Sequence, residues 1–235
     1  MAYNEALLGL TAAASASFVF LAWKLDKERL YSAIVVFLIL ISVAGSKLVD
    51  FFGHETNTGN IFYASVFLAT YFLIERYGRR EGIRSIGIGI MFVVGFTILL
   101  QLVVGLDNAP GTDAFGNALA AALNPASRLA FASLLAYVVS QYLNVHLYSY
   151  LKEHMEAMRG GIWIRANISN IMAQAVDSGI FFTVAFWGVV PPGNVWEVLL
   201  TGFAIKVVYI MLASPLLYFN HIEEEAGGYV SVTVL

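Results

Sequence analysis

Four polar side chains share one side of a strongly apolar stretch: Asn167, Asn170, Gln174 and Asp177. They are spaced 3, 4 and 3 residues apart, so an α-helix would present all of them on one face. A carboxylate near the centre of a bilayer costs about 3 kcal/mol to insert, which favours a functional role. Amides both donate and accept hydrogen bonds, and a carboxylate accepts them. The stripe therefore predicts a site for a flat, neutral, multiply hydrogen-bonding ligand, such as a nucleobase or a vitamin-like heterocycle.

The preceding apolar stretch carries a second polar and aromatic face. Its members recur at helical spacing and are Ser133, Tyr137, Ser140, Gln141, Asn144 and Tyr148. Two such faces on consecutive antiparallel helices either bond to each other or line a wet cavity. Interhelical hydrogen bonds contribute only about 0.6 kcal/mol on average, so polar helix–helix glue is the competing interpretation. The crowding of amides, including Gln141 and Asn144, favours a ligand site in which Asp177 reads a guanine-type edge and Tyr71 offers a stacking face.

Nothing in the chain indicates catalysis, a metal or a cofactor. The four histidines are scattered, HExxH and GxSxG motifs do not occur, and there is no cysteine for a disulfide or a thiolate. We therefore expect a protein that is not an enzyme.

Composition places the chain in a membrane. Of its 235 residues, 59% are hydrophobic and only 12% are charged, whereas a soluble domain has about 25% charged residues. The mean hydropathy is +0.75. The net charge of −3 is too small to indicate a nucleic-acid partner, which leaves the lipid bilayer and a small molecule as expected partners.

Seven apolar runs are long enough to cross a bilayer, which takes about 20 residues. They occupy roughly residues 6–23, 31–52, 60–77, 83–106, 126–150, 163–190 and 195–219. The sequence thus predicts an all-α, polytopic membrane protein with seven transmembrane helices. We divide it into an extra N-terminal helix with the first cytoplasmic loop (1–29), a six-helix core (30–219) and an acidic cytoplasmic tail (220–235).

The basic residues predict the orientation. The connections after the first, third and fifth runs, with the run ends beside them, hold ten of the thirteen: Lys24, Lys27, Arg29, Arg76, Arg79, Arg80, Arg84, Lys152, Arg159 and Arg165. The alternate loops 54–59, 107–125 and 191–194 hold none. Because Lys and Arg concentrate on the cytoplasmic side, the N-terminus should lie outside and the C-terminus inside.

Three further basic residues fall within the apolar runs. Lys47 is expected toward the outer end of the second run, one turn from Asp50, as an ion pair or a functional group. Arg128 is shallow enough to snorkel to the outer surface. Lys206 lies mid-span and needs an anionic or carbonyl partner, for which Asp177 is the candidate.

Five segments of the chain resemble the queuosine precursor transporters, a family also called the vitamin uptake transporters. They are KLVDFFG (47–53), GNIFYASVFLATYFLIERYGRREG (59–82), RLAFASLLAYVVSQYLNVHLYSYLK (128–152), WIRANISNIMAQAVDSGIFFTVAFWG (163–188) and KVVYIMLASPLLY (206–218). The resemblance implies uptake of a 7-deazaguanine such as 7-cyano-7-deazaguanine or its aminomethyl analogue. It also implies a core similar to the substrate-binding subunits of energy-coupling-factor transporters, with no evident ATPase partner.

The family pattern maps onto eleven positions: Lys47, Glu75, Arg128, Ser140, Gln141, Arg165, Asn167, Ser169, Gln174, Asp177 and Lys206. Many members have Asp where this chain has Tyr71 and Asn144, so the chain departs from the family pattern at these two positions.

The sequence favours an uptake transporter in the plasma or inner membrane. The expected substrate contacts are Asp177, Gln174, Asn170, Asn167, Gln141, Asn144, Lys206, Arg128, Lys47 and Tyr71. Glu75, next to Arg76 and Arg79, is expected to form an inner gate or salt-bridge cluster, to which Arg165 also belongs. Within the outer loop 107–125, residues 118–123 are expected to form a short surface helix.

Several alternatives stay open at this stage. They are a transporter of another nucleobase-like or vitamin-like heterocycle, a membrane enzyme acting on a lipid, and a scaffold whose polar stripes are glue. The scaffold predicts that Asp177→Asn destabilises the fold and that no small molecule binds. The energy source and a homo-oligomeric state are equally open.

Overall fold

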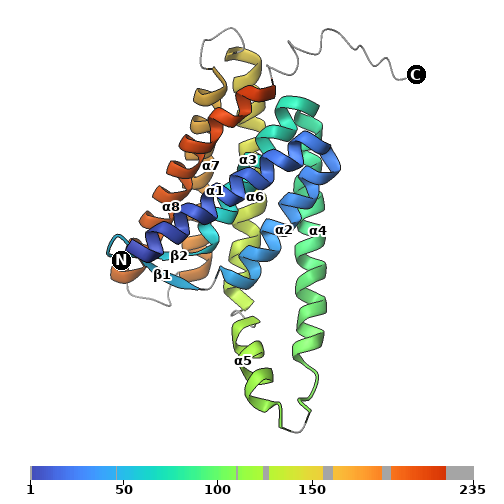
Figure 1. The fold of residues 1–235 in the computed structure, drawn as a ribbon, viewed down its shortest axis with the longest axis vertical. Coiled ribbons are helices and arrows are strands. Elements are labelled where there is room, and N and C mark those ends of the chain that lie inside the picture. The colour runs from blue at the N-terminus through green and yellow to red at the C-terminus, as the bar shows by residue number, and fades with distance from the viewer. Residues whose placement is uncertain are drawn as a thin grey trace, which may run out of the picture.

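A computed structural model describes residues 2–45, 47–109, 111–123, 127–155, 161–186 and 192–220. Within these residues the chain is all-α apart from one β-hairpin. Seven helices have 18 or more residues: α1 (Ala2–Leu25), α2 (Lys27–Ala44), α3 (Gly59–Tyr77), α4 (Arg79–Val104), α6 (Ser127–Met155), α7 (Gly161–Phe186) and α8 (Pro192–Ala213). A shorter helix, α5 (Asp113–Leu123), confirms the helix expected in the outer loop, and a 3₁₀ turn, η1 (Ser214–Tyr218), follows α8. Figure 1 shows α4 and α6 along the long axis of the bundle, with α1 crossing one side.

The seven long helices fall where the seven apolar runs predict them. Among the described residues, three segments are long and apolar enough to cross a membrane: Tyr3–Leu25, Arg79–Val104 and Leu199–Tyr218. The outward-facing surface of α4 is apolar, with Met91 61%, Leu99 66% and Leu102 65% exposed. Such a surface fits lipid better than water. The crossing of the other helices remains a prediction.

The basic connections meet at one end of the bundle. Lys27 lies 4.0 Å from the Glu81 carboxylate, to which Tyr31 also donates a hydrogen bond, and Lys152 lies 3.4 Å from Glu75. We call this the basic end, which is uppermost in Figure 1, and the opposite one the hairpin end. The clustering of basic residues at one end agrees with the predicted alternation of loops.

The second predicted helix is shorter than its apolar run. The α2 helix ends at Ala44, and the next residues form an antiparallel hairpin of β1 (Leu48–Phe51) and β2 (His54–Asn57). Lys47 is exposed just before β1, so its placement in a membrane helix is wrong. Its expected partner Asp50 instead accepts a hydrogen bond from the Gly53 N–H at 3.2 Å.

The hairpin is also bonded to α1, which is distant in sequence. The Asn4 amide donates to the Asp50 carbonyl at 3.1 Å, and the Glu5 carboxylate accepts from the Phe52 N–H at 3.1 Å. Such tertiary contacts override local propensity, and an apolar run cannot reveal them.

The hairpin turn carries local strain. Phe52 and Gly53 have φ of 52° and 82°, as a two-residue type I′ turn requires. A bulky side chain in this left-handed region costs about 1 kcal/mol, whereas asparagine tolerates it.

Phe52→Asn is therefore expected to raise the free energy of unfolding by about 1 kcal/mol. The readout is the thermal unfolding midpoint of the protein in detergent. Phe51→Asn, in the extended strand next to it, is the control and should give no gain. Equal responses of the two variants would contradict the strain argument.

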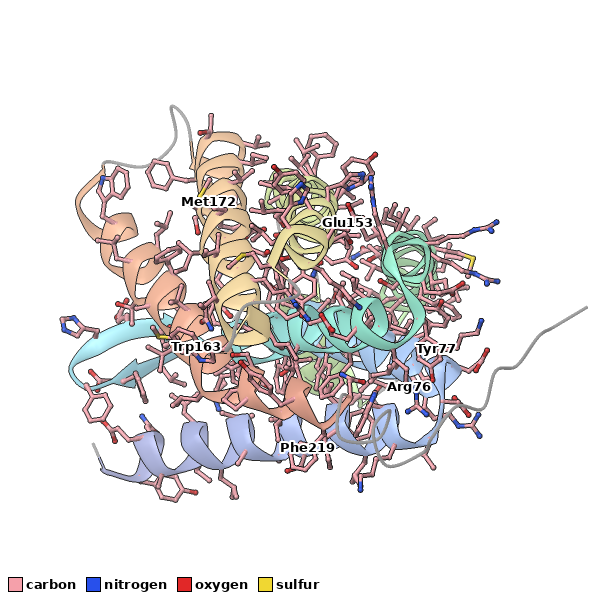
Figure 2. All side chains as sticks on the ribbon, turned by 90° about the horizontal axis from the view of Figure 1, so that it is seen from above. Arg76, Tyr77, Glu153, Trp163, Met172 and Phe219 are labelled. Carbon is pink, nitrogen blue, oxygen red and sulfur yellow. The ribbon has the colours of Figure 1, made fainter. Side chains whose placement is uncertain are left out.

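The α3 helix lies at the centre of the packing. It is buried along most of its length and packs against α1, α2, α4, α6 and α8. Trp23 from α1 is 1% exposed and packs on Phe72 of α3, with ring centroids 5.2 Å apart. Figure 2, viewed from the basic end, shows α1 lying along one side of the bundle near Phe219, whose ring is 5.3 Å from that of Phe20. The α1 helix is thus a packed layer of the bundle.

Pro215 ends the regular part of α8. Proline has no N–H, so the helical bond to the Met211 carbonyl cannot form. The Trp163 indole N–H of α7 donates to that carbonyl at 3.0 Å instead. Nearby, the Asn167 amide lies 3.3 Å from the Ser214 hydroxyl. The α7 helix therefore supports the break between α8 and η1.

Candidate functional site

The two polar faces predicted for α6 and α7 face each other. Near the hairpin end, Ser140 lies 3.3 Å from Asp177, and near the basic end Tyr148 lies 3.5 Å from Arg165. The helices are therefore antiparallel, and the amides between these contacts share the same levels. We call these four residues the amide band: Gln141, Asn144, Asn170 and Gln174.

The amide band is almost completely buried, with every side chain at most 1% exposed. Within each helix it is linked only by long contacts of 3.5 Å, from Asn144 to Gln141 and from Gln174 to Asn170. Three of its atoms have no partner: the Gln141 Nε2, the Asn170 Nδ2 and the Gln174 Oε1. A buried polar atom without a partner costs about 1–3 kcal/mol, and native proteins usually satisfy it. The band is thus equipped to bind a ligand or water through two donors and one acceptor.

Asp177 borders the band on the side of the hairpin end. Its Oδ1 accepts a hydrogen bond from the Tyr63 hydroxyl at 2.6 Å, and its Oδ2 lies 3.2 Å from the Lys206 Nζ. The Lys206 ammonium also sits 4.9 Å from the centre of the Tyr63 ring, a cation–π distance. The predicted pairing of Lys206 with Asp177 is confirmed. We call Asp177, Lys206, Tyr63 and Ser140 the Asp177 cluster.

Glu75 borders the band on the side of the basic end. Its Oε1 accepts from the Tyr148 hydroxyl and from the Arg165 guanidinium, both at 2.7 Å, and Lys152 approaches its Oε2 at 3.4 Å. The predicted salt bridge between Glu75 and Arg165 is confirmed. We call Glu75, Tyr148, Arg165 and Lys152 the Glu75 cluster.

Arg76, the residue after Glu75, has contacts on another side of α3. The Arg76 guanidinium donates to the Trp23 carbonyl at 3.0 Å and lies over the Trp23 ring. Successive helical residues point about 100° apart, so Arg76 leaves α3 on a different side from Glu75. Figure 2 shows Arg76 and Tyr77 at the end of α3, toward α1 and α2.

Tyr71 connects the amide band to the Glu75 cluster. Its hydroxyl donates to the Asn144 Oδ1 at 2.8 Å, and its ring stacks on Tyr148 with centroids 4.5 Å apart. The two positions that depart from the resembled family are therefore hydrogen-bonded to each other. In this chain the two positions form a neutral tyrosine–amide pair.

Other predicted site residues lie at the edge of this arrangement or outside it. The Asn167 amide donates to the Trp163 carbonyl at 2.8 Å, while its Oδ1 and the Ser169 hydroxyl are buried without a partner. Lys47 is exposed at the hairpin end. The side chain of Arg128 lies outside the described residues.

Tyr63 is a site residue that the sequence did not predict. It contacts both charged members of the Asp177 cluster. Tyr63, Phe67, Tyr71 and Glu75 recur every fourth residue, so one face of α3 points along the whole site. That spacing was visible in the sequence but is hard to distinguish from an ordinary packing face.

Comparison with known proteins now identifies the family. The family model described as "Putative vitamin uptake transporter" matches residues 57–220. The chain belongs to this family. It is accordingly a membrane transporter and not an enzyme.

Two curated relatives carry more specific names. The chain is 31% identical over 173 residues to a "Probable queuosine precursor transporter" of Bacillus subtilis (strain 168), covering 73% of this chain and 74% of that protein. It is 27% identical over 158 residues to a "Queuosine precursor transporter" of Escherichia coli (strain K12), covering 65% and 66% respectively. No solved structure matches the chain.

The match to the vitamin uptake transporter family contains the whole site. Residues 57–220 include α3 and all later elements that the structure describes, with the amide band and both clusters. The first two helices and the hairpin, with Lys47, lie almost entirely before the matched region.

Proposed function

We propose that the chain takes up a queuosine precursor base and that the amide band is its substrate site. The observation that carries the proposal is the set of unpaired, fully buried atoms on Gln141, Asn170 and Gln174. The names of the two relatives support the substrate class.

The chemistry of the band fits a 7-deazaguanine such as 7-cyano-7-deazaguanine or its aminomethyl analogue. A guanine-type edge places a carbonyl oxygen next to an N–H. The Gln174 Oε1 would accept from the N–H, and the Gln141 and Asn170 amides would donate to the carbonyl and to a further acceptor. The stacked rings of Tyr71 and Tyr148 border the band and add apolar contact.

Asp177 does not contact the base directly in this arrangement. The sequence suggested that its carboxylate reads the base directly, with Lys206 balancing the charge. Both of its oxygens have partners inside the protein, so we give the reading of the base to the amides. Glu75 and Arg165 close the path toward the basic end, as an inner gate.

The proposal extends to topology. Seven helices cross the plasma membrane in a multi-pass arrangement, the N-terminus lies outside, and the basic end faces the cytoplasm, as the Lys and Arg distribution favours. The core is similar to energy-coupling-factor substrate-binding subunits, and α1 is the additional helix. Assembly into a homo-oligomer is compatible with this arrangement.

Uptake into proteoliposomes tests the proposal. Purified protein reconstituted in liposomes should accumulate radiolabelled 7-cyano-7-deazaguanine to a saturable level, and the aminomethyl analogue should compete. Competition by a different heterocycle alone would instead support the alternative substrate. Uptake no greater than that of protein-free liposomes, for each of these bases and for guanine, would refute the transport assignment.

A further inference from the structure

Both oxygens of the Asp177 carboxylate already have partners inside the protein. The Asp177 Oδ1 accepts from Tyr63 at 2.6 Å with Ser140 at 3.3 Å, and its Oδ2 holds Lys206 at 3.2 Å. By contrast, buried polar atoms without a partner, which a ligand could bind, lie on the amides.

The cluster is a junction between helices. Tyr63 comes from α3, Ser140 from α6, Asp177 from α7 and Lys206 from α8. The same carboxylate therefore fastens α8 to α3 and α7 at one level of the bundle. Both charged side chains are largely buried, with Asp177 9% and Lys206 7% exposed.

The Glu75 cluster has the same construction at the other end of the band. Each carboxylate accepts a tyrosine O–H, at 2.6 Å in one cluster and 2.7 Å in the other. Each also pairs with a buried cation, Lys206 at 3.2 Å and Arg165 at 2.7 Å. Along α6 and α7 the amide band lies between the two clusters. A transporter must open its site to one side at a time, which requires a separable closure on each side.

We infer that the Asp177 cluster is the gate of the substrate site at the hairpin end, the counterpart of the Glu75 cluster at the basic end. Opening separates Lys206 and Tyr63 from Asp177 and frees α8 from α3 and α7 at this level. The structure is then the occluded state, with both gates closed. That the band holds a base rests on the proposed function, but the existence of the gate does not.

The absence of cysteine from the chain allows a direct test without a ligand. Gln141→Cys introduces a single thiol into the band, at a position that is 1% exposed when both gates are closed. Its reaction with a membrane-impermeant maleimide is followed from each side, in intact cells and in inside-out vesicles. Full labelling in SDS gives the total thiol.

Adding Asp177→Asn should accelerate labelling from the hairpin side by about tenfold or more, since the loss of a single charge-assisted hydrogen bond already shifts an opening equilibrium by about that factor. Labelling from the basic side should stay unchanged. Glu75→Gln is the matched control and should give the opposite sidedness. Tyr63→Phe removes a single hydroxyl and should also accelerate labelling from the hairpin side, so the test does not depend on one variant.

Unchanged labelling in both Asp177→Asn and Tyr63→Phe would overturn the gate. Acceleration from both sides would also overturn it, because it would show a loosened bundle. Binding of 7-cyano-7-deazaguanine to the unsubstituted chain is measured separately. Absence of that binding would refute the proposed function and would not affect the labelling result.

Discussion

Replacing Gln141 and Gln174 together by methionine is expected to abolish ligand binding while leaving the protein at least as stable as before. Each glutamine has a buried atom without a partner and otherwise only a 3.5 Å contact to a neighbouring amide. Methionine has a similar length and no strong polar group, so about 1–3 kcal/mol of desolvation cost per site is removed. A bound base would lose two hydrogen bonds, which should weaken its affinity by about 100-fold or more.

Equilibrium binding and the thermal unfolding midpoint in detergent measure the two effects. Ser149→Ala is the control, because Ser149 also lies on α6 and also has a buried, unpaired hydroxyl, yet it is not part of the band. Its stability should likewise not fall, and its ligand binding should be unchanged. A double methionine variant that is clearly destabilised would favour the interpretation of the amides as glue between helices.

Lys206→Met is expected to destabilise the protein strongly, and Asp177→Asn in the same chain is expected to restore most of the loss. Removing one partner of a buried ion pair leaves an uncompensated charge and costs about 3–5 kcal/mol, whereas replacing both is often close to neutral. Unfolding midpoints of the two single variants and the double variant complete the cycle.

An exposed ion pair provides the comparison for that cycle. Arg29 and Asp26 lie 2.9 Å apart, but their side chains are 60% and 38% exposed. Arg29→Met should therefore cost at most about 1 kcal/mol. If the losses at Asp177 and Lys206 were simply additive, the two residues would not form the coupled buried pair described here.

The sequence predicted the site best where polar residues interrupt an apolar helix. The stripe on α7 and the face on α6 were visible because helical spacing fixes which side chains share a face. Lys206 and Asp177 could be paired in advance because each carries a charge at a similar depth in the bilayer and needs an opposite one.

What the sequence could not predict depends on contacts between distant segments. The first strand of the hairpin lies at the end of an apolar run, and its pairing with the second strand and its bonds to Asn4 and Glu5 cannot be read from that run. Tyr63 looked like one more aromatic in a packed helix. The ionic partners of Glu75 come from α6 and α7, and its position next to Arg76 in the sequence does not reveal both of them.

The partners of the Asp177 carboxylate oxygens could not be predicted from the sequence either. A carboxylate in an apolar helix predicts function, but whether its oxygens are free depends on which side chains reach them. Here they are occupied by Tyr63, Ser140 and Lys206, and the amides nearby are left unpaired. The orientation of buried amides, which decides the ligand, is set by packing across helices.

Equilibrium binding of 7-cyano-7-deazaguanine to the purified protein tests the central claim most directly. We expect saturable binding of one base per chain, competition by the aminomethyl analogue, and loss of binding in the Gln141→Met/Gln174→Met variant. Absence of saturable binding for 7-cyano-7-deazaguanine, the aminomethyl analogue, queuine and guanine, with a folded protein, would contradict it.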